Sequence, residues 1–304
     1  MQNSSWTDKR MEGPSVIPGV LYVVATPIGN LGDNTLRALQ VLGSVDLILA
    51  EDTRISARLL RRFTITTRLK AFHEHNEQKM APWVVEQLDE GMSIALISDA
   101  GTPLLRDPGL YLMRLLRAQG KKTVPVPGPS ALVCALSVAG LPTDRFVFEG
   151  FLPVKREARR HRLQGLVEEA RTLVVYEAPH RILATTQDMA EVLGGERQVV
   201  IARELTKAFE TIYSGSLSAI AHRLSEDSNN QRGEFVVVVE GKPKVDPIEG
   251  AGEGAVTAED QRILHLLMEE LPLKKAVILA ARLTGRKKNA LYRIALQEHA
   301  SAPQ

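Results

Sequence analysis

Residues 93–103 read Ser93-Ile94-Ala95-Leu96-Ile97-Ser98-Asp99-Ala100-Gly101-Thr102-Pro103. The apolar run 93–98 predicts a short strand that is buried on both faces. It ends in a polar loop whose glycine lets the backbone approach a ligand closely. Because ligands of open α/β sheets bind beyond the carboxyl ends of the strands, we expect a ligand at the loop 98–103.

Similar apolar runs lie on both sides of this segment, at 20–25, 45–50 and 121–126. Segments with apolar residues at helical spacing separate the runs, and they cover 34–43, 55–63, 77–90 and 110–119. Alternating strands and helices of this kind predict a mostly parallel, doubly wound sheet.

The second half of the chain predicts another α/β domain. We expect strands at 172–176, 198–202 and 235–240, and an antiparallel strand at 209–214 before a helix at 217–224. Residues 242–255 are rich in glycine, proline and acidic residues, which is typical of a linker. The tail has helical periodicity around a basic turn at Gly285, as in a helix-turn-helix.

The chain is therefore expected to be α/β, with two consecutive α/β domains and a small C-terminal helical unit that resembles a helix-turn-helix. The predicted division is a disordered lead (1–17), an N-terminal α/β domain (18–143), a C-terminal α/β domain (144–241), a linker (242–256) and a basic helical accessory unit (257–304).

Composition places the chain among ordinary globular proteins, with 304 residues, 44% of them hydrophobic and 24% charged. The single cysteine, Cys134, excludes a disulfide framework and a cysteine-rich zinc site. The N-terminal residues lack the apolar core of a signal peptide, and no apolar run has bilayer-spanning length. A reducing cytoplasm is the expected location.

Polar residues follow the other predicted strands as well, at 26–33, 51–54, 72–77 and 127–130. We call such a segment, which directly follows a strand, the exit of that strand. Each exit could be an ordinary tight turn, but five polar exits at one sheet edge favour a site for a nucleotide-like ligand. The amides around Gly101 and Ser130 could donate hydrogen bonds to such a ligand.

Other ligand classes find less support. Neither a Gly-x-Gly-x-x-Gly motif after the first strand nor a P-loop is present, which disfavours nicotinamide and P-loop chemistry. His73 and His75 alternate as along one strand face, but with no third ligand in view they predict no metal site.

Six segments together resemble the tetrapyrrole-methylase superfamily, which consists of S-adenosylmethionine (SAM) methyltransferases. More narrowly, they resemble its ribosomal RNA branch, the small-subunit rRNA cytidine 2′-O-methyltransferases. The segments are 21–33 (LYVVATPIGNLGD), 50–54 (AEDTR), 98–103 (SDAGTP), 126–131 (VPGPSA), 176–181 (YEAPHR) and 202–207 (ARELTK). Tetrapyrrole methylases have a Gly-Gly-Asp-Pro type loop where this chain has 99–103, a departure that favours the RNA branch.

The resemblance implies SAM in the cleft between the two α/β domains, and a homodimer. By matching motifs it implies cofactor contacts, most of them through the backbone, at Pro27, Asp99, Ala100, Gly101, Leu105, Ser130, Ala131, Glu177 and Leu205. It also implies methylation of a cytidine ribose 2′-oxygen in the decoding region of 16S rRNA, within the small ribosomal subunit. The alternatives are methylation of a tetrapyrrole and a non-catalytic RNA-binding relative.

A ribose hydroxyl is a weak nucleophile, so a nearby group could accept its proton as the methyl is transferred. The candidates are Glu51, Asp52 and His73, which stand at predicted strand ends facing the same crevice. Structural roles are equally open, because Asp52 could pair with Arg54 and Glu51 could cap the following helix.

Basic residues gather in three places that suit contacts with RNA phosphates. These are Arg54, Arg58, Arg61 and Arg62 on one short helix, Lys155, Arg156, Arg159 and Arg160 beside the domain junction, and Lys287 and Lys288 in the tail. Such residues also form ordinary solvated helix faces. The tail could serve RNA docking, which we favour, or dimerisation and stability.

Overall fold

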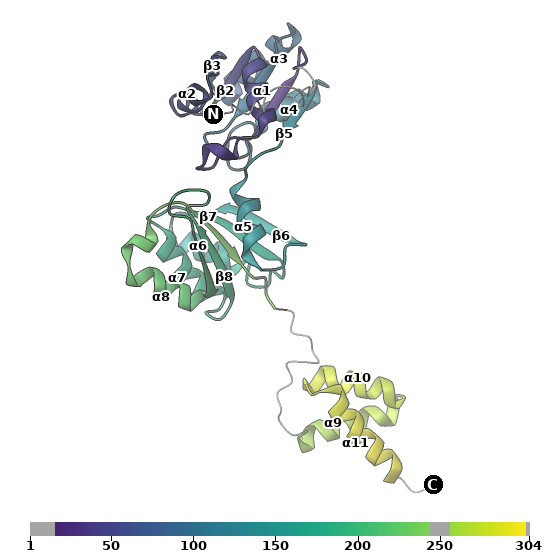
Figure 1. Ribbon diagram of the computed structural model, residues 1–304. Coiled ribbons are helices and arrows are strands. Elements are labelled where there is room, and N and C mark those ends of the chain that lie inside the picture. The colour runs from purple at the N-terminus through teal and green to yellow at the C-terminus, as the bar shows by residue number, and fades with distance from the viewer. Residues whose placement is uncertain (1–15, 244–255, 302–304) are drawn as a thin grey trace, which may run out of the picture. The chain divides into compact units, whose positions relative to one another are not determined.

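The structure is a computed structural model that describes residues 16–243 and 256–301. The chain forms two compact units, the first ending at Lys242 and the second beginning at Pro243. Within the first unit, two five-stranded sheets define what we call the first and second domains (Figure 1). Most of the predicted disordered lead and of the predicted linker lies outside the described residues.

The first sheet is wholly parallel, with strand order β3-β2-β4-β1-β5. Its strands are β1 (Leu21–Val24), β2 (Leu47–Ala50), β3 (Leu69–Ala71), β4 (Ile94–Ile97) and β5 (Thr123–Val126). The prediction of a mostly parallel, doubly wound sheet is confirmed. Parallel strands with every residue buried, such as β2 and β4, need cover on both faces of the sheet.

Helices supply that cover. Side chains of odd and even strand positions point to opposite faces, and they form two separate cores. One core packs Tyr22 and Ile48 against α1 (Leu36–Ser44) and α2 (Thr53–Arg62). The other packs Leu21 and Leu49 against α3 (Glu77–Asp89) and α4 (Leu110–Ala118).

The second sheet is mixed, with order β6-β7-β10-β8-β9. The pair β6–β7 is parallel and the other pairs are antiparallel, including the expected antiparallel strand β9 beside β8. Its strands are β6 (Phe146–Phe151), β7 (Thr172–Glu177), β8 (Gln198–Arg203), β9 (Thr211–Ser216) and β10 (Phe235–Val239). Strand β6, at the start of the second half, was not expected, because a bulge at Gly150 (φ +66°) interrupts its alternation.

Helices α6 (Arg156–Gln164), α7 (Ile182–Leu193) and α8 (Leu217–Glu226) cover one face of this sheet. Helix α5 (Ala131–Ala139) covers the other, where Leu132 and Leu136 pack on Val174 and Val236. The predicted first domain ran to residue 143 and so included α5. The structure corrects this, because the apolar face of α5 is buried against the second sheet (Figure 1).

The second unit contains α9 (Ala258–Glu270), α10 (Leu273–Thr284) and α11 (Lys288–Ser301) around a small core of its own. A capping box joins Thr257 and Asp260 at the start of α9. Gly285, at φ +70°, ends α10 in the left-handed conformation.

Two short 3-10 helices, η1 (Leu31–Asp33) and η2 (Ser228–Gln231), complete the elements of the first unit. No helix among the described residues combines the length and apolar character needed to cross a membrane.

Candidate functional site

Three loops at the carboxyl ends of β1, β4 and β5 are tied together by hydrogen bonds. The backbones of Thr26 and Gly101 form a two-way bridge, with N···O distances of 2.9 and 3.0 Å. The Thr26 hydroxyl donates to the Ser98 carbonyl, and the Thr102 hydroxyl donates to the Pro129 carbonyl at 3.0 Å. The loops therefore form one continuous wall, because the three strands are neighbours in the sheet.

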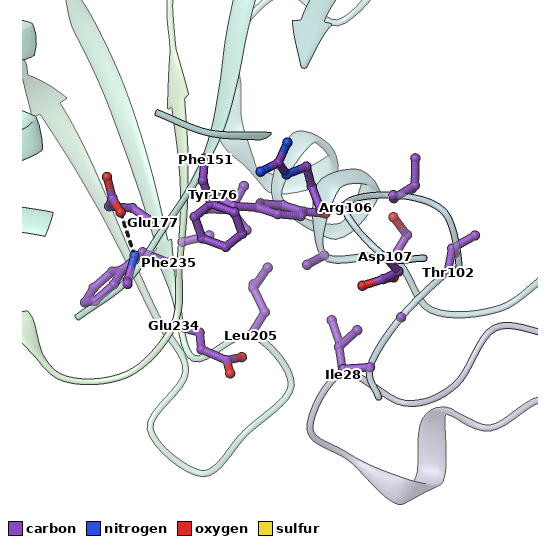
Figure 2. A pocket seen from close by; sticks show the side chains of 18 of the residues that line it. Ile28, Thr102, Arg106, Asp107, Phe151, Tyr176, Glu177, Leu205, Glu234 and Phe235 are labelled. Atoms are coloured by element: carbon purple, nitrogen blue, oxygen red, sulfur yellow. Dashed lines mark hydrogen bonds between the residues drawn. The ribbon is translucent and has the colours of Figure 1, made fainter. Parts of the chain in front are cut away.

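This wall closes one side of a pocket of about 460 Å³, a volume typical of small-molecule sites (Figure 2). The second sheet closes the other side through the ends of β6, β7, β8 and β10. The lining residues are Ile28, Asp99, Ala100, Gly101, Thr102, Leu105, Arg106, Asp107, Ser130, Ala131, Phe151, Tyr176, Glu177, Ala178, Pro179, Ala202, Leu205, Glu234, Phe235 and Val236.

Eight of the nine residues that the sequence suggested for cofactor binding line this pocket, and Pro27 does not. Its neighbour Ile28 does. The apolar lining from the second domain, notably Phe151, Tyr176 and Val236, was not predicted from the sequence. A motif match could have indicated Tyr176, which stands beside Glu177, but no local pattern places β10 against a loop of the first domain.

The pocket offers apolar walls together with a few unsatisfied donors. The Ser130 hydroxyl is buried and has no hydrogen-bond partner among the described residues. It stands at the N-terminus of α5, where first-turn N–H groups are free to bind an acceptor. Gly101 is different, because its own N–H already donates to Thr26 and is not available to a ligand. Because glycine has no side chain, Gly101 instead lets a ligand approach the backbone closely.

Two carboxylates link the exits of β2 and β4. Asp99 Oδ1 accepts a hydrogen bond from the Asp52 N–H at 3.0 Å, and the Glu51 carboxylate accepts one from the Asp99 N–H. Burial raises the pKa of Glu51, and the negative charge of Asp99 adds to the rise. Burial likewise raises the pKa of Asp99. A carboxylate with a raised pKa is a better proton acceptor, so Glu51 keeps the character of a base.

Asp52 has a structural role. It is the N-cap of α2 and receives hydrogen bonds from the Arg54 N–H at 2.8 Å and from the Arg54 guanidinium. These bonds hold the pKa of Asp52 well below its usual range, which makes it a poor base. The pairing that the sequence left open is the one observed, and Asp52 rather than Glu51 caps the helix.

His73 lies in the turn before α3 and not along a strand as expected. Its ring stands edge-on to His75 at 6.0 Å between centroids. The ring Nδ1 is buried, with no partner in the described part of the chain. The His73 ring lies near Glu51 and offsets part of the rise in the pKa of that carboxylate. Within residues 16–243 and 256–301, no three His, Cys, Asp or Glu side chains are placed to hold a metal ion.

Asp107, which no sequence pattern indicated, lines the pocket directly. Burial raises its pKa to about 6, and the charge of Glu51 contributes to the shift. The signal was weak, because Asp107 is a single acidic residue beside Pro108 and Gly109 in a loop and no periodicity marks it.

The basic helix α2 follows directly from the carboxylates at the β2 exit. Arg54, Arg58, Arg61 and Arg62 are all exposed and share one side of the helix through spacings of three and four residues. Arg54 is engaged with Asp52, and the Arg61 side chain donates to the Ala57 carbonyl. The structure therefore brings this first basic group together as a surface beside the β2 exit, and we call it the α2 arginine face.

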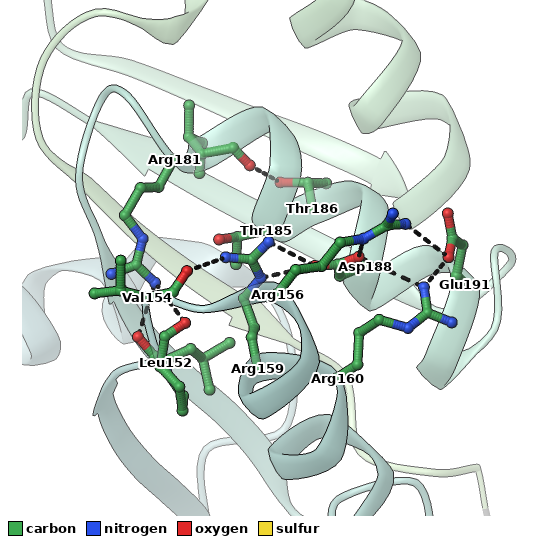
Figure 3. A network of polar contacts seen from close by, with 12 residues as sticks. Leu152, Val154, Arg156, Arg159, Arg160, Arg181, Thr185, Thr186, Asp188 and Glu191 are labelled. Atoms are coloured by element: carbon green, nitrogen blue, oxygen red, sulfur yellow. Dashed lines mark hydrogen bonds and ion pairs between the residues drawn. The ribbon is translucent and has the colours of Figure 1, made fainter.

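The second basic group is largely neutralised (Figure 3). Arg159 is only 5% exposed and binds Asp188 through Nη2 at 2.6 Å and Nε at 2.8 Å. Arg156 and Arg160 pair with Asp188 and Glu191. The expectation that Arg159 contacts RNA is wrong, because its guanidinium lies inside the second domain. Of this group only Lys155 is exposed with no ion pair among the described residues.

In the second unit, Lys287 is exposed and Lys288 is half-buried at the start of α11. The neighbouring Arg286 binds Asp260 of α9 at 2.7 Å, which fixes the turn between α10 and α11. Lys287 and Lys288 thus stand on a turn that a buried carboxylate holds in place.

Known proteins resemble this chain over most of its length. Residues 20–221 match the family described as Tetrapyrrole (Corrin/Porphyrin) Methylases, and residues 254–299 match the RsmI C-terminal HTH domain. The protein named Ribosomal RNA small subunit methyltransferase I of Pseudomonas aeruginosa is 55% identical over 279 residues, which are 92% of this chain and 97% of that protein. Its namesake in Escherichia coli O157:H7 is 51% identical over 280 residues, 92% and 96% of the two chains.

Solved structures share the fold at low identity. A uroporphyrin-III-C-methyltransferase from Thermus thermophilus has a TM-score of 0.51 at 20% identity and covers 73% of this chain and 94% of its own. The cobalt precorrin-4 methyltransferase of cobalamin biosynthesis has a TM-score of 0.52 at 18% identity, with 73% and 95% covered. These likenesses concern the arrangement of the two α/β domains.

Proposed function

Because the chain belongs to the tetrapyrrole methylase family, we propose that it is a SAM-dependent methyltransferase that acts on small-subunit ribosomal RNA. In finer detail, we propose that the acceptor is the 2′-oxygen of a cytidine ribose in 16S rRNA. The observation that carries the proposal is the pocket between the two sheets, whose wall includes residues of the loop 98–103. Asp99 of this wall accepts a hydrogen bond from the N–H of Asp52, the N-cap of the helix that bears the α2 arginine face. The names and high identity of the relatives support the same substrate.

The pocket suits SAM, which has a flat adenine ring that packs on apolar side chains and a polar ribose and amino-acid end. Ile28, Leu105 and Val236 offer apolar walls, while the unpaired Ser130 hydroxyl and the N-terminus of α5 offer donors. The Glu177 side chain is unavailable to a ligand, because it accepts hydrogen bonds from Thr185 at 2.6 Å and from the Ala178 N–H. Only its backbone would contact the cofactor. When bound, SAM supplies an electrophilic methyl group.

The chain itself has to position an RNA hydroxyl at that methyl group. In-line displacement gains most of its rate from holding the two reacting atoms in near-attack geometry. The two domains can do so by fixing the cofactor in the pocket while basic side chains hold the RNA backbone. We also propose a homodimer and a cytoplasmic location, in keeping with the family resemblance.

One experiment tests the proposal against its alternatives. The purified protein is incubated with methyl-labelled SAM and either small ribosomal subunits or uroporphyrinogen, and the label is located by nuclease digestion and mass spectrometry. Label on the 2′-oxygen of a cytidine supports the proposal. Label on the tetrapyrrole would instead identify the protein as a tetrapyrrole methyltransferase. No transfer at all would identify it as a non-catalytic RNA-binding relative.

We predict that the α2 arginine face binds RNA phosphates. The double substitution Arg58→Glu with Arg62→Glu should weaken binding to small-subunit RNA at least about tenfold and reduce the slope of log affinity against log salt by roughly two. Filter binding at several salt concentrations measures both quantities.

The matched control reverses Arg114 and Arg117, which are exposed on α4 against the opposite face of the same sheet. It carries the same charge change, so equal weakening by both pairs would show a general charge effect and contradict the assignment.

For the second unit we propose RNA docking through the turn at Lys287 and Lys288. Lys287→Glu with Lys288→Glu should raise KM for the RNA particle by about tenfold with kcat unchanged, because a second contact on the same chain raises the effective concentration of the RNA at the site. Arg262→Glu on α9 is the control, since Arg262 already faces Glu259 at 3.8 Å. A change in sedimentation or melting temperature, with KM unaltered, would indicate a dimerisation or stability element instead.

A further inference from the structure

Four carboxylates line the pocket, and three of them are already engaged. Glu177 binds Thr185 and lies 3.3 Å from Arg181. Glu234 is paired with Lys207 at 3.1 Å. Asp99 accepts the backbone N–H of Asp52. Each of these three has a hydrogen-bond or ion-pair partner that orients the side chain.

Asp107 is the fourth, and it has neither a cation nor a backbone N–H as a partner among the described residues. Its one hydrogen-bonding neighbour is the Ser98 hydroxyl at the end of β4. Figure 2 shows Asp107 on the first-domain side of the pocket, across from Leu205 and Tyr176. A carboxylate that lines a ligand pocket with a single hydroxyl as its partner has oxygen lone pairs left to bind the ligand or a proton.

The loop that carries Asp107 is held in unusual backbone conformations. Leu104 and Arg106 have φ values of +71° and +79°, which are uncommon for residues other than glycine, and Gly109 follows at +130°. Strain of this kind persists where the surrounding structure enforces it, often at functional sites. Here the Arg106 guanidinium packs over the Phe151 ring of the second domain, 5.7 Å from its centroid. The loop thus contacts the second domain through Arg106 and lines the first-domain side of the pocket with Asp107.

Several charged or titratable groups face Asp107. Glu51 from the β2 exit and Asp99 from the β4 exit are negative, Tyr176 of β7 stands across the pocket, and Arg106 precedes it in the loop. Burial and the two neighbouring carboxylates raise the pKa of Asp107 to about 6. Near neutral pH the side chain is therefore mostly ionised but is a stronger base than an ordinary aspartate.

We propose that Asp107 is the group that accepts the proton of the RNA hydroxyl during methyl transfer. The inference rests on the proposed function and names a residue for it. The hydroxyl oxygen donates an electron pair to the methyl carbon of the sulfonium donor. The carbon–sulfur pair returns to sulfur, and the hydroxyl proton passes to an Asp107 carboxylate oxygen, from which water removes it.

Asp107 takes the place of the three candidate bases that the sequence suggested. Glu51, Asp52 and His73 do not line the pocket, and Asp52 is held by Arg54. Glu51 lies close enough to Asp107 for its charge to act on it. None of the three lines the pocket in which the proton has to be taken up.

The first test is Asp107→Asn, which keeps the shape of the side chain and removes its basicity. We expect SAM affinity, measured by isothermal titration calorimetry, to stay within about twofold of the wild type. We expect kcat for labelled-methyl transfer to small subunits to fall by about 10²- to 10⁴-fold, the range for loss of a general base. Asp144→Asn, at an exposed position outside the pocket, is the matched control and should leave both quantities unchanged.

The second test does not depend on activity or on a variant of Asp107 that folds. In protein labelled with ¹³C at aspartate carboxyls and free of SAM, one resonance should titrate with a midpoint near 6. Glu51→Gln removes a negative neighbour, which favours the ionised form of Asp107. The midpoint should therefore move to lower pH.

The outcomes separate the two proposals. If the wild type transfers no methyl group to the RNA, the proposed function fails, whatever the titration gives. If the wild type is active and Asp107→Asn equals it, or if Asp107→Asn loses SAM binding in parallel with activity, the role of Asp107 as proton acceptor is overturned. If the midpoint stays in place in Glu51→Gln, the titrating carboxyl does not lie near Glu51, and its assignment to Asp107 is overturned.

Discussion

Replacing Gly101 with valine is expected to abolish binding of SAM. Gly101 lines the pocket at φ +80°, a conformation that β-branched residues avoid at a cost of about 1–3 kcal/mol. A Cβ at this position would stand 3.3 Å from the Ile28 Cγ2 atom, so the side chain would press on the neighbouring loop after β1. The two-way bridge between Thr26 and Gly101 would open, and the wall of the pocket would lose its shape.

We expect the affinity for SAM, measured by isothermal titration calorimetry, to fall by roughly a hundredfold or more, which corresponds to about 3 kcal/mol. Gly91→Val is the control, because Gly91 has a similar φ of +93° but a Cβ there would meet nothing within 4 Å. It carries the same kind of backbone strain at a position that does not line the pocket. Equal losses of SAM affinity in both variants would mean that strain, and not the wall of the pocket, is responsible.

Arg159→Ala is expected to cause the largest loss of stability among the basic residues of the second domain. The guanidinium and the Asp188 carboxylate are both at least 95% buried and in direct contact, so removing Arg159 leaves a buried carboxylate without its main partner. Breaking a buried pair in this way costs about 3–5 kcal/mol. Arg159 also donates to the Val154 carbonyl at 3.3 Å, which would lose its partner (Figure 3).

Urea unfolding followed by circular dichroism measures the change in the free energy of unfolding. Arg156→Ala, which also removes a contact with Asp188 but has a side chain that is 65% exposed, should cost no more than about 1 kcal/mol. Arg159→Ala with unchanged stability and weaker RNA binding would restore Arg159 to the RNA-contacting residues and contradict the structural role.

The loops of the first domain could be predicted because their signals are local. The runs at 20–25, 45–50, 93–98 and 121–126 each end in a polar segment, and parallel strands place such ends at one edge of a sheet. Asp99, Ala100, Gly101 and Ser130 were therefore expected near one another from the sequence, and they do line one pocket.

Residues with partners far along the chain could not be assigned in this way. In the sequence Arg159 cannot be told apart from its neighbours Arg156 and Arg160. Only the packing of α6 on α7 shows that Arg159 forms a buried ion pair with Asp188. Asp52 and Glu51 are adjacent and chemically alike. Hydrogen bonds from Arg54 lower the pKa of Asp52, whereas burial and the charge of Asp99 raise the pKa of Glu51.

Local patterns in the sequence were enough to predict the alternation of strands and helices, the polar ends of the first sheet and the glycine at the turn of the second unit. These follow from periodicity and from backbone preferences that act over a few residues. Other features depend on how distant segments pack together. These are the position of α5 on the second sheet and the part that β10 takes in the pocket. The surroundings of Asp107 are another, since it has neither a cation nor a backbone N–H as a partner among the described residues. Burial and charge pairing depend on which residues are neighbours in space. A local sequence pattern does not show which distant residues those neighbours are.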